Sequence, residues 1–243
     1  MFLDVDGTLV DFVEHPEQSQ AARRLICVLT DLLGLARGAL ALVSGRTIES
    51  VDAIFEPLRL PISGLHGHER RDTLGHTSRA PLDASVLTSA KARFKDFVAD
   101  HPATFVEEKG AGIALHYRRA PSEATEVEKL AVEIEGQLPE PFCVQRGKMV
   151  IEIRSCQNSK GSAIEAFMNE PSFAGRTPVF LGDDATDEYG FRWVNEHGGH
   201  SIKVGSGSTA ARFRLDGVGG VEEWLEDYVR FLHATDGGQA HGG

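Results

Sequence analysis

Short apolar runs separated by segments of helical spacing form the main pattern of the chain. Four of these runs are predicted to be buried strands of a parallel sheet: Met1–Val5, Ala39–Val43, Val179–Leu181 and Ser201–Val204. Between the first two, Ser19–Leu33 repeats apolar residues along one helical face. Strands that alternate with helices predict right-handed crossovers and a doubly wound, Rossmann-like α/β core with a parallel sheet.

The middle of the chain has a different pattern. Gly112–Arg118, Phe142–Gln145 and Met149–Arg154 alternate apolar and polar residues, as half-exposed antiparallel strands do. Two stretches of helical spacing accompany them, Asp83–Ala99 and Ser122–Gln137. The sequence therefore predicts an α+β cap domain inserted into the α/β core.

These patterns predict three parts of the chain. Residues 1–67 and 160–232 form the core, and residues 68–159 form the inserted domain. Residues 233–243 are glycine-rich without periodicity, so we expect a disordered tail. Only three residues precede Asp4 in the first predicted strand, so whether the chain continues upstream of Met1 stays open.

The composition excludes several classes of protein. The 243 residues carry a net charge of −11, which argues against a surface that binds nucleic acid or anionic lipid. No run of roughly 18 apolar residues occurs, so no membrane span is expected. The first residues lack the basic region of a secretory signal. We expect a cytoplasmic monomer whose partner is a small molecule.

The number and spacing of the cysteines also indicate a cytoplasmic protein. Cys27, Cys143 and Cys156 are odd in number, far apart and outside any CxxC pair. This spacing argues against a disulfide framework or a zinc site. Each cysteine is predicted to be a small buried apolar side chain in a reducing cytoplasm.

Two aspartates lie at the end of the first predicted strand. Asp4 and Asp6 are two residues apart, and Gly7 permits a sharp turn whose backbone N–H groups can face an anion. Open α/β sheets bind ligands beyond the carboxyl ends of their strands. An acidic surface turn is the alternative for such a pair, but the apolar run before it favours a ligand site.

A second strand end carries a hydroxyl group. Ser44 and Gly45 follow the strand Ala39–Val43 and precede helical spacing, so the hydroxyl and free N–H groups there suit a phosphate oxygen. A serine N-cap would produce the same pattern. Lys160, just before the helical Ser162–Met168, is by itself a solvated charge, and it gains interest because the carboxylates elsewhere need a cation.

The most specific motif follows the strand Val179–Leu181. Asp183, Asp184, Asp187 and Glu188 place four acids within six residues, an arrangement that repels itself unless cations neutralise it. Mg²⁺ prefers a few carboxylates together with water and phosphate oxygens. A solvated acidic loop is the alternative, and the apolar strand before the cluster argues against it. Together the strand ends indicate phosphoryl transfer.

These motifs, in this order, resemble the haloacid-dehalogenase superfamily of phosphatases. The superfamily features are DVDGTL, the serine of SGR, the lysine of SKG and GDDATDE. Further stretches are similar to its trehalose-6-phosphate phosphatases: Gly64–Glu69, Ala114–Arg118, Gly147–Arg154 and the GDDATDE form itself. The resemblance runs from about residue 2 to about residue 230.

The resemblance implies a role for each residue of the motifs. Asp4 would attack phosphorus and form an aspartyl-phosphate. Asp6 would protonate the leaving sugar oxygen and then activate water. Mg²⁺ would bind Asp4, the backbone carbonyl of Asp6, and Asp183, whereas Ser44 and Lys160 would bind the phosphoryl oxygens. The residues implied to support the metal site are Asp184 and Asp187.

The inserted domain resembles the family's cap, a lid that closes over the sugar and excludes water. Lys148 and Glu152 stand four apart in a predicted strand, so both face the same way and would reach sugar hydroxyls. A surface salt bridge would fit this pair as well. The remaining candidates for substrate contact are Gly45, Arg46, His66, Glu69 and Arg118. The implied reaction is hydrolysis of trehalose 6-phosphate in trehalose biosynthesis.

Two alternatives stay open at this point. The first is the same chemistry on another sugar phosphate, such as sucrose phosphate, with different lid contacts. The second is a catalytically silent domain that binds a sugar phosphate or regulates a partner enzyme. A silent domain usually lacks the nucleophile, the acid/base or a metal ligand, and this chain retains Asp4, Asp6 and Asp183.

Overall fold

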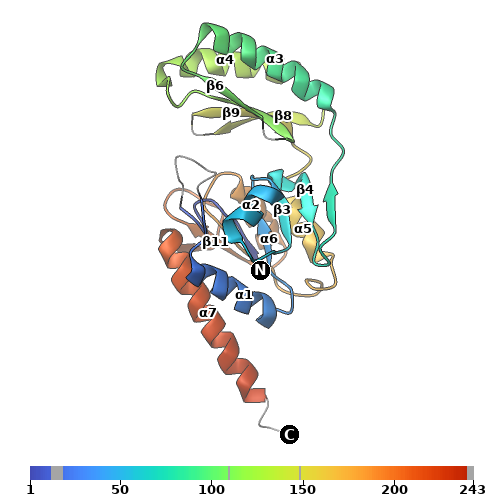
Figure 1. Cartoon of the computed structure of the whole chain (residues 1–243), viewed down its shortest axis with the longest axis vertical. Helices are drawn as coiled ribbons and strands as arrows, with labels where there is room; N and C mark the ends of the chain where they lie inside the picture. The colour runs from blue at the N-terminus through green and yellow to red at the C-terminus, as the bar shows by residue number, and fades with distance from the viewer. Residues whose placement is uncertain (12–18, 109, 148, 240–243) are drawn as a thin grey trace. The chain divides into compact units, whose positions relative to one another are not determined.

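The computed structural model describes residues 1–11, 19–108, 110–147 and 149–239. The chain divides into two compact units, which we describe separately (Figure 1). The larger unit comprises residues 1–79 and 159–243, and the smaller comprises residues 80–158.

Within its described residues, the larger unit contains an eight-stranded sheet in the order β12-β11-β10-β1-β2-β3-β4-β5. Its strands are β1 (Phe2–Leu3), β2 (Ala41–Val43), β3 (Ile62–Gly64), β4 (Glu69–Arg71), β5 (Thr77–Arg79), β10 (Val179–Gly182), β11 (His200–Val204) and β12 (Phe213–Leu215). The strands from β12 to β3 run parallel, and β4 and β5 add an antiparallel edge. The predicted parallel α/β core is therefore confirmed.

Helices cover both faces of this sheet. They are α1 (Arg23–Leu35), α2 (Ile48–Phe55), α5 (Lys160–Met168), α6 (Asp187–Glu196) and α7 (Gly217–Gln239), with a short 3₁₀ turn η2 (Leu65–Gly67) after β3. Successive strand residues point to opposite faces, so Leu3 packs with α1, α2 and α7, and Phe2 packs with α5 and α6. The two apolar clusters make β1, β2 and β10 a buried centre that holds the strand ends in place.

The smaller unit is an antiparallel sheet with two helices on one face (Figure 1). Its strands pair in the order β6-β7-β9-β8, and its elements are β6 (Phe105–Glu108), β7 (Gly112–His116), β8 (Phe142–Gly147), β9 (Val150–Ser155), α3 (Ala84–Asp100), the 3₁₀ turn η3 (Pro121–Glu123) and α4 (Ala124–Glu135). Phe94 of α3 and Ile153 of β9 are fully buried in one cluster with Val127 of α4. This arrangement confirms the inserted α+β domain.

The boundary between the units lies later in the chain than the sequence predicts. Residues 68–79, assigned by pattern to the insertion, belong to the larger unit. The reason is backbone pairing: β4 pairs with β3, and β5 pairs with β4, so this hairpin extends the large sheet. The second boundary falls between residues 158 and 159.

The end of the chain is more helical than predicted. Residues 233–239, expected to be disordered, continue α7, and residues 240–243 lie outside the described part. The helix is anchored against the core by Val221, Leu225 and Val229. Once such turns are packed, each added residue costs little, because helix formation is cooperative. No helix in the described ranges has the length and apolar character needed to cross a membrane.

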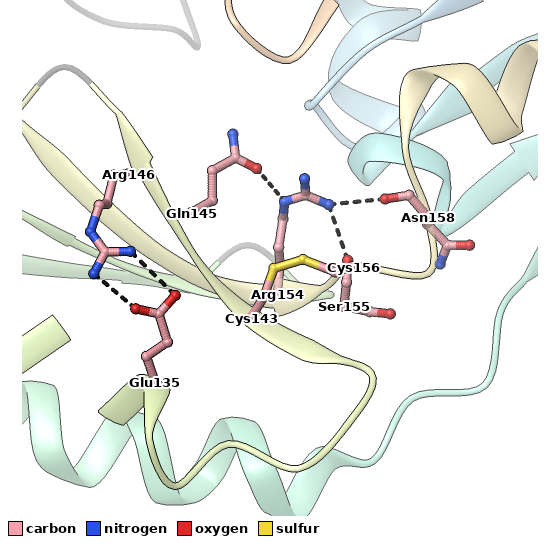
Figure 2. Close-up of a disulfide and its surroundings, with 8 residues drawn as sticks. All are labelled: Glu135, Cys143, Gln145, Arg146, Arg154, Ser155, Cys156 and Asn158. Carbon is pink, nitrogen blue, oxygen red and sulfur yellow. Dashed lines mark hydrogen bonds and ion pairs between the residues drawn. A yellow bond between two sulfur atoms is a disulfide. The ribbon is translucent and has the colours of Figure 1, made fainter. Parts of the chain in front are cut away.

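The cysteines differ from the sequence-based expectation. Cys143 of β8 and Cys156, just after β9, form a disulfide with a Cα–Cα distance of 5.9 Å, and Cys27 is exposed (Figure 2). The prediction of three buried, unpaired cysteines is therefore wrong. Cys143 and Cys156 lie 13 positions apart in the sequence, but the β8/β9 ladder pairs Phe142 with Ser155 and so brings the two cysteines together. Cysteine spacing alone does not reveal this pairing.

Candidate functional site

The ends of three adjacent parallel strands collect the predicted catalytic residues of the larger unit. Asp4 follows β1, Ser44 follows β2, and Asp183 follows β10, which flanks β1 on its other side. The backbone N–H of Asp4 donates to the carbonyl of Leu181 at 3.0 Å, which fixes the first carboxylate against the third strand end. Sheet order thus places these polar groups at one edge, where open α/β sheets bind ligands.

Lys160 lies between two of the carboxylates. Its Nζ is 2.6 Å from Oδ1 of Asp4 and 2.6 Å from Oδ1 of Asp187, and the three side chains are at most 5% exposed. Lys160 is the first residue of α5, whose N-cap Ser159 forms a capping box with Ser162. This cap fixes the helix start, and with it the position from which the lysine reaches the cluster.

Asp187 serves as a structural anchor within the motif. Its Oδ2 accepts the backbone N–H groups of Asp183 at 2.9 Å and Asp184 at 3.0 Å, while its Oδ1 accepts Lys160. A Cβ at Gly182 would stand 2.3 Å from Cγ of Asp187, so only glycine permits this approach. Through these bonds Asp187 fixes the backbone of Asp183 and Asp184 and holds the amine of Lys160.

Asp184 closes the turn before α6. Its Oδ1 accepts the backbone N–H of Thr186 at 2.8 Å, the hydroxyl of Thr186 at 2.6 Å and the N–H of Asp187 at 3.2 Å. These bonds satisfy donors at the start of α6. The side chain therefore shapes the acidic loop, which agrees with a supporting role.

Burial and mutual repulsion oppose ionisation of the cluster. Burial raises the pKa of Asp4 to about 7, and the charges of Asp183 and Asp184 add to the rise, although Lys160 opposes it. Burial and then Asp187 and Asp184 raise the pKa of Asp183 to about 6. Burial lowers the pKa of Lys160, but Asp187 and Asp4 outweigh it, and the lysine stays charged. The amine of Lys160, with that of Lys203 on the carbonyl of Asp183, faces the four carboxylates of Asp4, Asp183, Asp184 and Asp187, so negative charge remains that a further cation can offset.

The carboxylates could hold a metal ion. Single oxygens of Asp4, Asp183 and Asp187 all lie within 4.8 Å of one another. Oδ1 of Asp183 is buried and has no hydrogen-bond partner among the described residues. A buried acceptor without a donor costs free energy unless a ligand satisfies it. The donor set is oxygen only, which Mg²⁺ prefers, so the residues present fit this ion.

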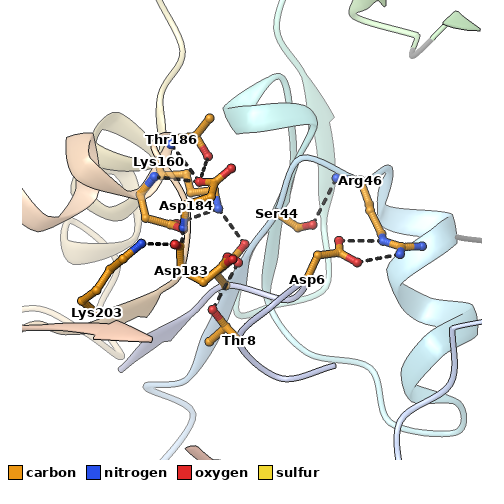
Figure 3. A network of polar contacts seen from close by, with 11 residues as sticks. Asp6, Thr8, Ser44, Arg46, Lys160, Asp183, Asp184, Thr186 and Lys203 are labelled. Atoms are coloured by element: carbon orange, nitrogen blue, oxygen red, sulfur yellow. Dashed lines mark hydrogen bonds and ion pairs between the residues drawn. The ribbon is translucent and has the colours of Figure 1, made fainter. Parts of the chain in front are cut away.

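Asp6 points away from the other carboxylates and toward Arg46 (Figure 3). Its Oδ1 is 2.6 Å from Nη2 of Arg46, and its Oδ2 is 2.7 Å from Nε. Arg46 was predicted as a substrate contact from the sequence. The structure instead places its guanidinium on the predicted acid/base.

The loop after β2 is tightly packed. Ser44 is buried, and its Oγ accepts the backbone N–H of Arg46 at 3.1 Å. Ser44 is not the helix cap, because Thr47 caps α2 by accepting the N–H of Ser50. A Cβ at Gly45 would stand 2.7 Å from the ring of His66, so this glycine lets the imidazole lie on the loop backbone. Ser44, Gly45 and His66 are thus brought together.

Glu69, also predicted as a substrate contact, is engaged within the larger unit. It is buried on β4, and its Oε2 accepts the backbone N–H of Ile48 at 3.1 Å. Its Oε1 lies 2.9 Å from Nη2 of Arg79. The carboxylate therefore satisfies the first turn of α2 and ties it to the β4/β5 hairpin.

The smaller unit carries the remaining candidates for substrate contact. Glu152 is buried on β9, opposite Ala114 and Gln145, and an added Cβ at Gly112 would stand 3.0 Å from its Oε1. Arg118 is exposed and lies past the end of β7, because β7 ends at His116. Lys148 lies outside the described residues.

Two residues at the site are missed by the sequence analysis. Lys203 of β11 is buried, and its Nζ donates to the backbone carbonyl of Asp183. Thr8 is buried, and its hydroxyl donates to Oδ2 of Asp4 at 3.3 Å. A lysine inside the apolar run Ser201–Val204 is a signal that could have found the first, because an uncompensated charge in a buried strand is costly.

Comparison with known proteins identifies phosphatases that are similar to this chain. The trehalose-phosphatase family model matches residues 2–218. The chain is 44% identical over 225 residues to the trehalose-6-phosphate phosphatase of Escherichia coli (strain K12), a match that covers 93% of this chain and 84% of that protein. It is 42% identical over 205 residues to the probable trehalose-phosphate phosphatase of Sinorhizobium fredii (strain NBRC 101917 / NGR234), covering 84% and 77%.

Solved structures share the fold. A trehalose-6-phosphate phosphatase related protein matches with a TM-score of 0.73 and 28% identity over 96% of this chain and 98% of that chain. The C-terminal domain of the C. albicans trehalose-6-phosphate phosphatase gives a TM-score of 0.82 at 24% identity, over 94% and 90% of the two chains. The second likeness shows the fold alone.

Proposed function

The chain belongs to the trehalose-phosphatase family, and on this premise we propose that it hydrolyses trehalose 6-phosphate to trehalose and inorganic phosphate. The enzyme is a phosphatase, as its relatives are. The observation that carries the proposal is the buried arrangement of Asp4, Lys160 and Asp187 beside Oδ1 of Asp183, which has no hydrogen-bond partner in the described part of the chain. A silent binding domain has no need to bury these charges.

Asp4 is the nucleophile in this proposal. Its carboxylate attacks phosphorus, the bond from phosphorus to the sugar oxygen breaks, and an aspartyl-phosphate forms on Asp4. Lys160, 2.6 Å from Asp4, holds one carboxylate oxygen and leaves the attacking oxygen oriented. Ser44, buried at the neighbouring strand end, supplies a hydroxyl for a phosphoryl oxygen. Positioning and charge neutralisation do most of the catalysis in phosphoryl transfer.

Asp6 is the acid/base in both half-reactions. It gives a proton to the sugar oxygen as that oxygen leaves, and trehalose departs. Asp6 then takes a proton from water, whose oxygen attacks the phosphorus of the aspartyl-phosphate. The bond to Asp4 breaks, inorganic phosphate leaves, and the Asp4 carboxylate is restored.

We include Mg²⁺ in the proposal. Asp4, Asp183 and the backbone carbonyl of Asp6 would hold the ion, with Asp184 and Asp187 supporting the loop. Bound there, Mg²⁺ neutralises phosphoryl charge. Support comes from the unpartnered Oδ1 of Asp183 and from carboxylates that one lysine does not balance.

The sugar is recognised by the smaller unit in this proposal, which assigns it the role of a lid. Its candidate contacts are Arg118 and Glu152, together with Lys148. Selectivity for trehalose 6-phosphate over another sugar phosphate, such as sucrose phosphate, then depends on these side chains, whereas the phosphoryl chemistry depends on the larger unit.

Phosphate release from a panel of sugar phosphates, with Mg²⁺ and with a chelator, tests the proposal. We expect Mg²⁺-dependent release that is fastest from trehalose 6-phosphate. Asp4→Asn keeps the shape but removes the nucleophile, so its turnover falls to background. Asp227→Asn, whose side chain is 69% exposed on α7, is the matched control and keeps full turnover. Comparable turnover by the wild type and Asp4→Asn would contradict the mechanism, and faster turnover of sucrose phosphate would change the substrate.

A further inference from the structure

Asp6 is held by Arg46 through a two-point contact. Both carboxylate oxygens are engaged, at 2.6 Å by Nη2 and at 2.7 Å by Nε. The side chains are 14% exposed for Arg46 and 24% for Asp6, so the pair is largely shielded from water. Paired, parallel N–H···O bonds of this kind fix orientation as well as distance.

Arg46 is itself fixed by its surroundings. Its Nη2 also donates to Ser19 Oγ at 3.1 Å, and its Nη1 to Ser50 Oγ at 3.4 Å. Its backbone N–H donates to Ser44 Oγ at 3.1 Å, and its carbonyl accepts the N–H of Leu65 at 2.8 Å. The guanidinium therefore stands on a rigid loop that also carries the candidate phosphate-binding hydroxyl.

The two aspartates of the DVDGTL motif contact different basic residues. Asp4 contacts Lys160 and lies within 4.8 Å of an oxygen of Asp183. Asp6 is directed to Arg46 (Figure 3). Each oxygen of Asp6 accepts one N–H group of Arg46 and keeps a second lone pair. An acid/base needs one oxygen within hydrogen-bond reach of the leaving sugar oxygen, and later of water. The two bonds fix the plane of the carboxylate, so turning one oxygen toward the sugar opens one bond while the other keeps the carboxylate in place.

We propose that Arg46 is a positioning residue that holds Asp6 through two bonds at rest and through one bond during turnover, so that a single released oxygen faces the leaving group. The inference rests on the proposed function and adds a task for Arg46 other than substrate contact. Lysine presents a point charge without the planar fork and cannot replace arginine in this task.

Substrates with different leaving groups separate this role from phosphate binding. A sugar oxygen needs a proton as it leaves, whereas 4-nitrophenolate leaves without one. We expect Arg46→Lys to slow turnover of trehalose 6-phosphate by about 10- to 100-fold, part of the roughly 10²- to 10⁴-fold contribution of a general acid or base. The rapid burst of 4-nitrophenolate from 4-nitrophenyl phosphate, which reports formation of the aspartyl-phosphate, changes less than about threefold because that step needs no acid.

A double-mutant cycle with Asp6→Asn tests whether Arg46 acts through Asp6. Coupled residues give non-additive losses. We expect Arg46→Lys to add no further loss of trehalose 6-phosphate turnover in the Asp6→Asn background. Additive losses, an equal loss on both substrates, or a rise in KM alone would overturn the inference and make Arg46 a phosphate contact.

Controls keep the outcome interpretable. Arg71 forms a comparable fork with Asp52 at 2.7 and 2.8 Å, away from the site, and Arg71→Lys should leave the ratio of the two substrates unchanged. Melting temperatures identify variants that fold, and guanidinium added to Arg46→Ala should restore trehalose 6-phosphate turnover. Absence of rescue in a folded Arg46→Ala contradicts the inference. A wild-type protein without phosphatase activity, or an active Asp4→Asn variant, would instead contradict the proposed function.

Discussion

At the scale of single residues, Lys160 determines the charge balance of the site. Its amine lies 2.6 Å from oxygens of both Asp4 and Asp187, and all three side chains are buried. Removing an ion from water costs several kcal/mol, which a buried contact offsets only with good geometry. One amine shared by two carboxylates leaves negative charge in excess. This excess of buried negative charge is costly for the fold and supports the proposal that the cluster serves catalysis and a further cation.

This balance predicts the effect of removing the amine. Lys160→Met leaves two buried carboxylates without their cation, so we expect the free energy of unfolding to fall by about 3–5 kcal/mol. Urea denaturation of metal-free protein near neutral pH measures the change. Arg230→Met, which removes a 71% exposed partner of Asp227 on α7 of the same unit, should change stability by less than about 0.5 kcal/mol. Equal denaturation midpoints for the two variants would show that the lysine is not needed to balance the carboxylates.

The position of a candidate residue could be predicted where the signal lies within one short segment. Asp4 and Asp183 each follow an apolar strand, and strand ends of a parallel sheet meet at one edge. The pairing of Asp6 with Arg46 spans 40 residues of sequence and depends on how two loops approach, which no local pattern contains. Glu69 shows the same limit: its contacts with the backbone of Ile48 and with Arg79 join separate elements, and no local pattern contains them.

At the scale of elements, the hydrophobic pattern predicted the buried strands and amphipathic helices but not the short edge hairpin. β4 and β5 are three residues each, and β5 is exposed throughout, so neither has an apolar period. β4 pairs with β3 and β5 pairs with β4, which places residues 68–79 in the larger unit. Edge strands are specified by backbone pairing more than by side-chain pattern, so sequence reasoning finds them poorly.

The disulfide is a second feature of element scale. The disulfide joins Cys143 on β8 to Cys156, just after β9. Arg154, on β9, donates to the carbonyls of Ser155 and Asn158 (Figure 2). Both contacts fix the segment that follows β9, shortly before Lys160. A covalent bond and an arginine thus act together on one short stretch of backbone.

Removing the disulfide should weaken the smaller unit. Chain-entropy arguments give about 3 kcal/mol for a loop of about 15 residues, an upper limit here because the β8/β9 ladder already joins the two strands. We expect dithiothreitol to lower the melting temperature of the wild type, and the Cys143→Ser/Cys156→Ser protein to melt at the lower temperature with or without reductant. Cys27→Ser, which removes the exposed thiol, is the control and should respond like the wild type. A wild-type melting temperature that reductant leaves unchanged would argue against the bond.

At the scale of the whole molecule, the proposed function assigns different tasks to two units with different sheets. The larger has a parallel sheet whose order places β1 between β2 and β10, so three strand ends supply carboxylates and a hydroxyl at one edge. The smaller has an antiparallel sheet with its own core of α3, α4 and β9. Because each unit has a separate core, side chains on the smaller sheet can change without disturbing the phosphoryl chemistry.

This division predicts that substrate selectivity and phosphoryl chemistry can be altered separately. Glu152→Gln on β9 keeps the shape of a buried side chain but removes its charge, so we expect a KM for trehalose 6-phosphate raised by about tenfold, since a hydrogen bond to a charged group contributes about 1.5–3 kcal/mol. Hydrolysis of 4-nitrophenyl phosphate, which lacks the sugar, should be unchanged. Glu126→Gln, at a 50% exposed position on α4 of the same unit, is the matched control and should keep the wild-type KM. If Glu152→Gln slows both substrates equally, the residue supports the fold of the smaller unit, and sugar recognition must be assigned to other side chains.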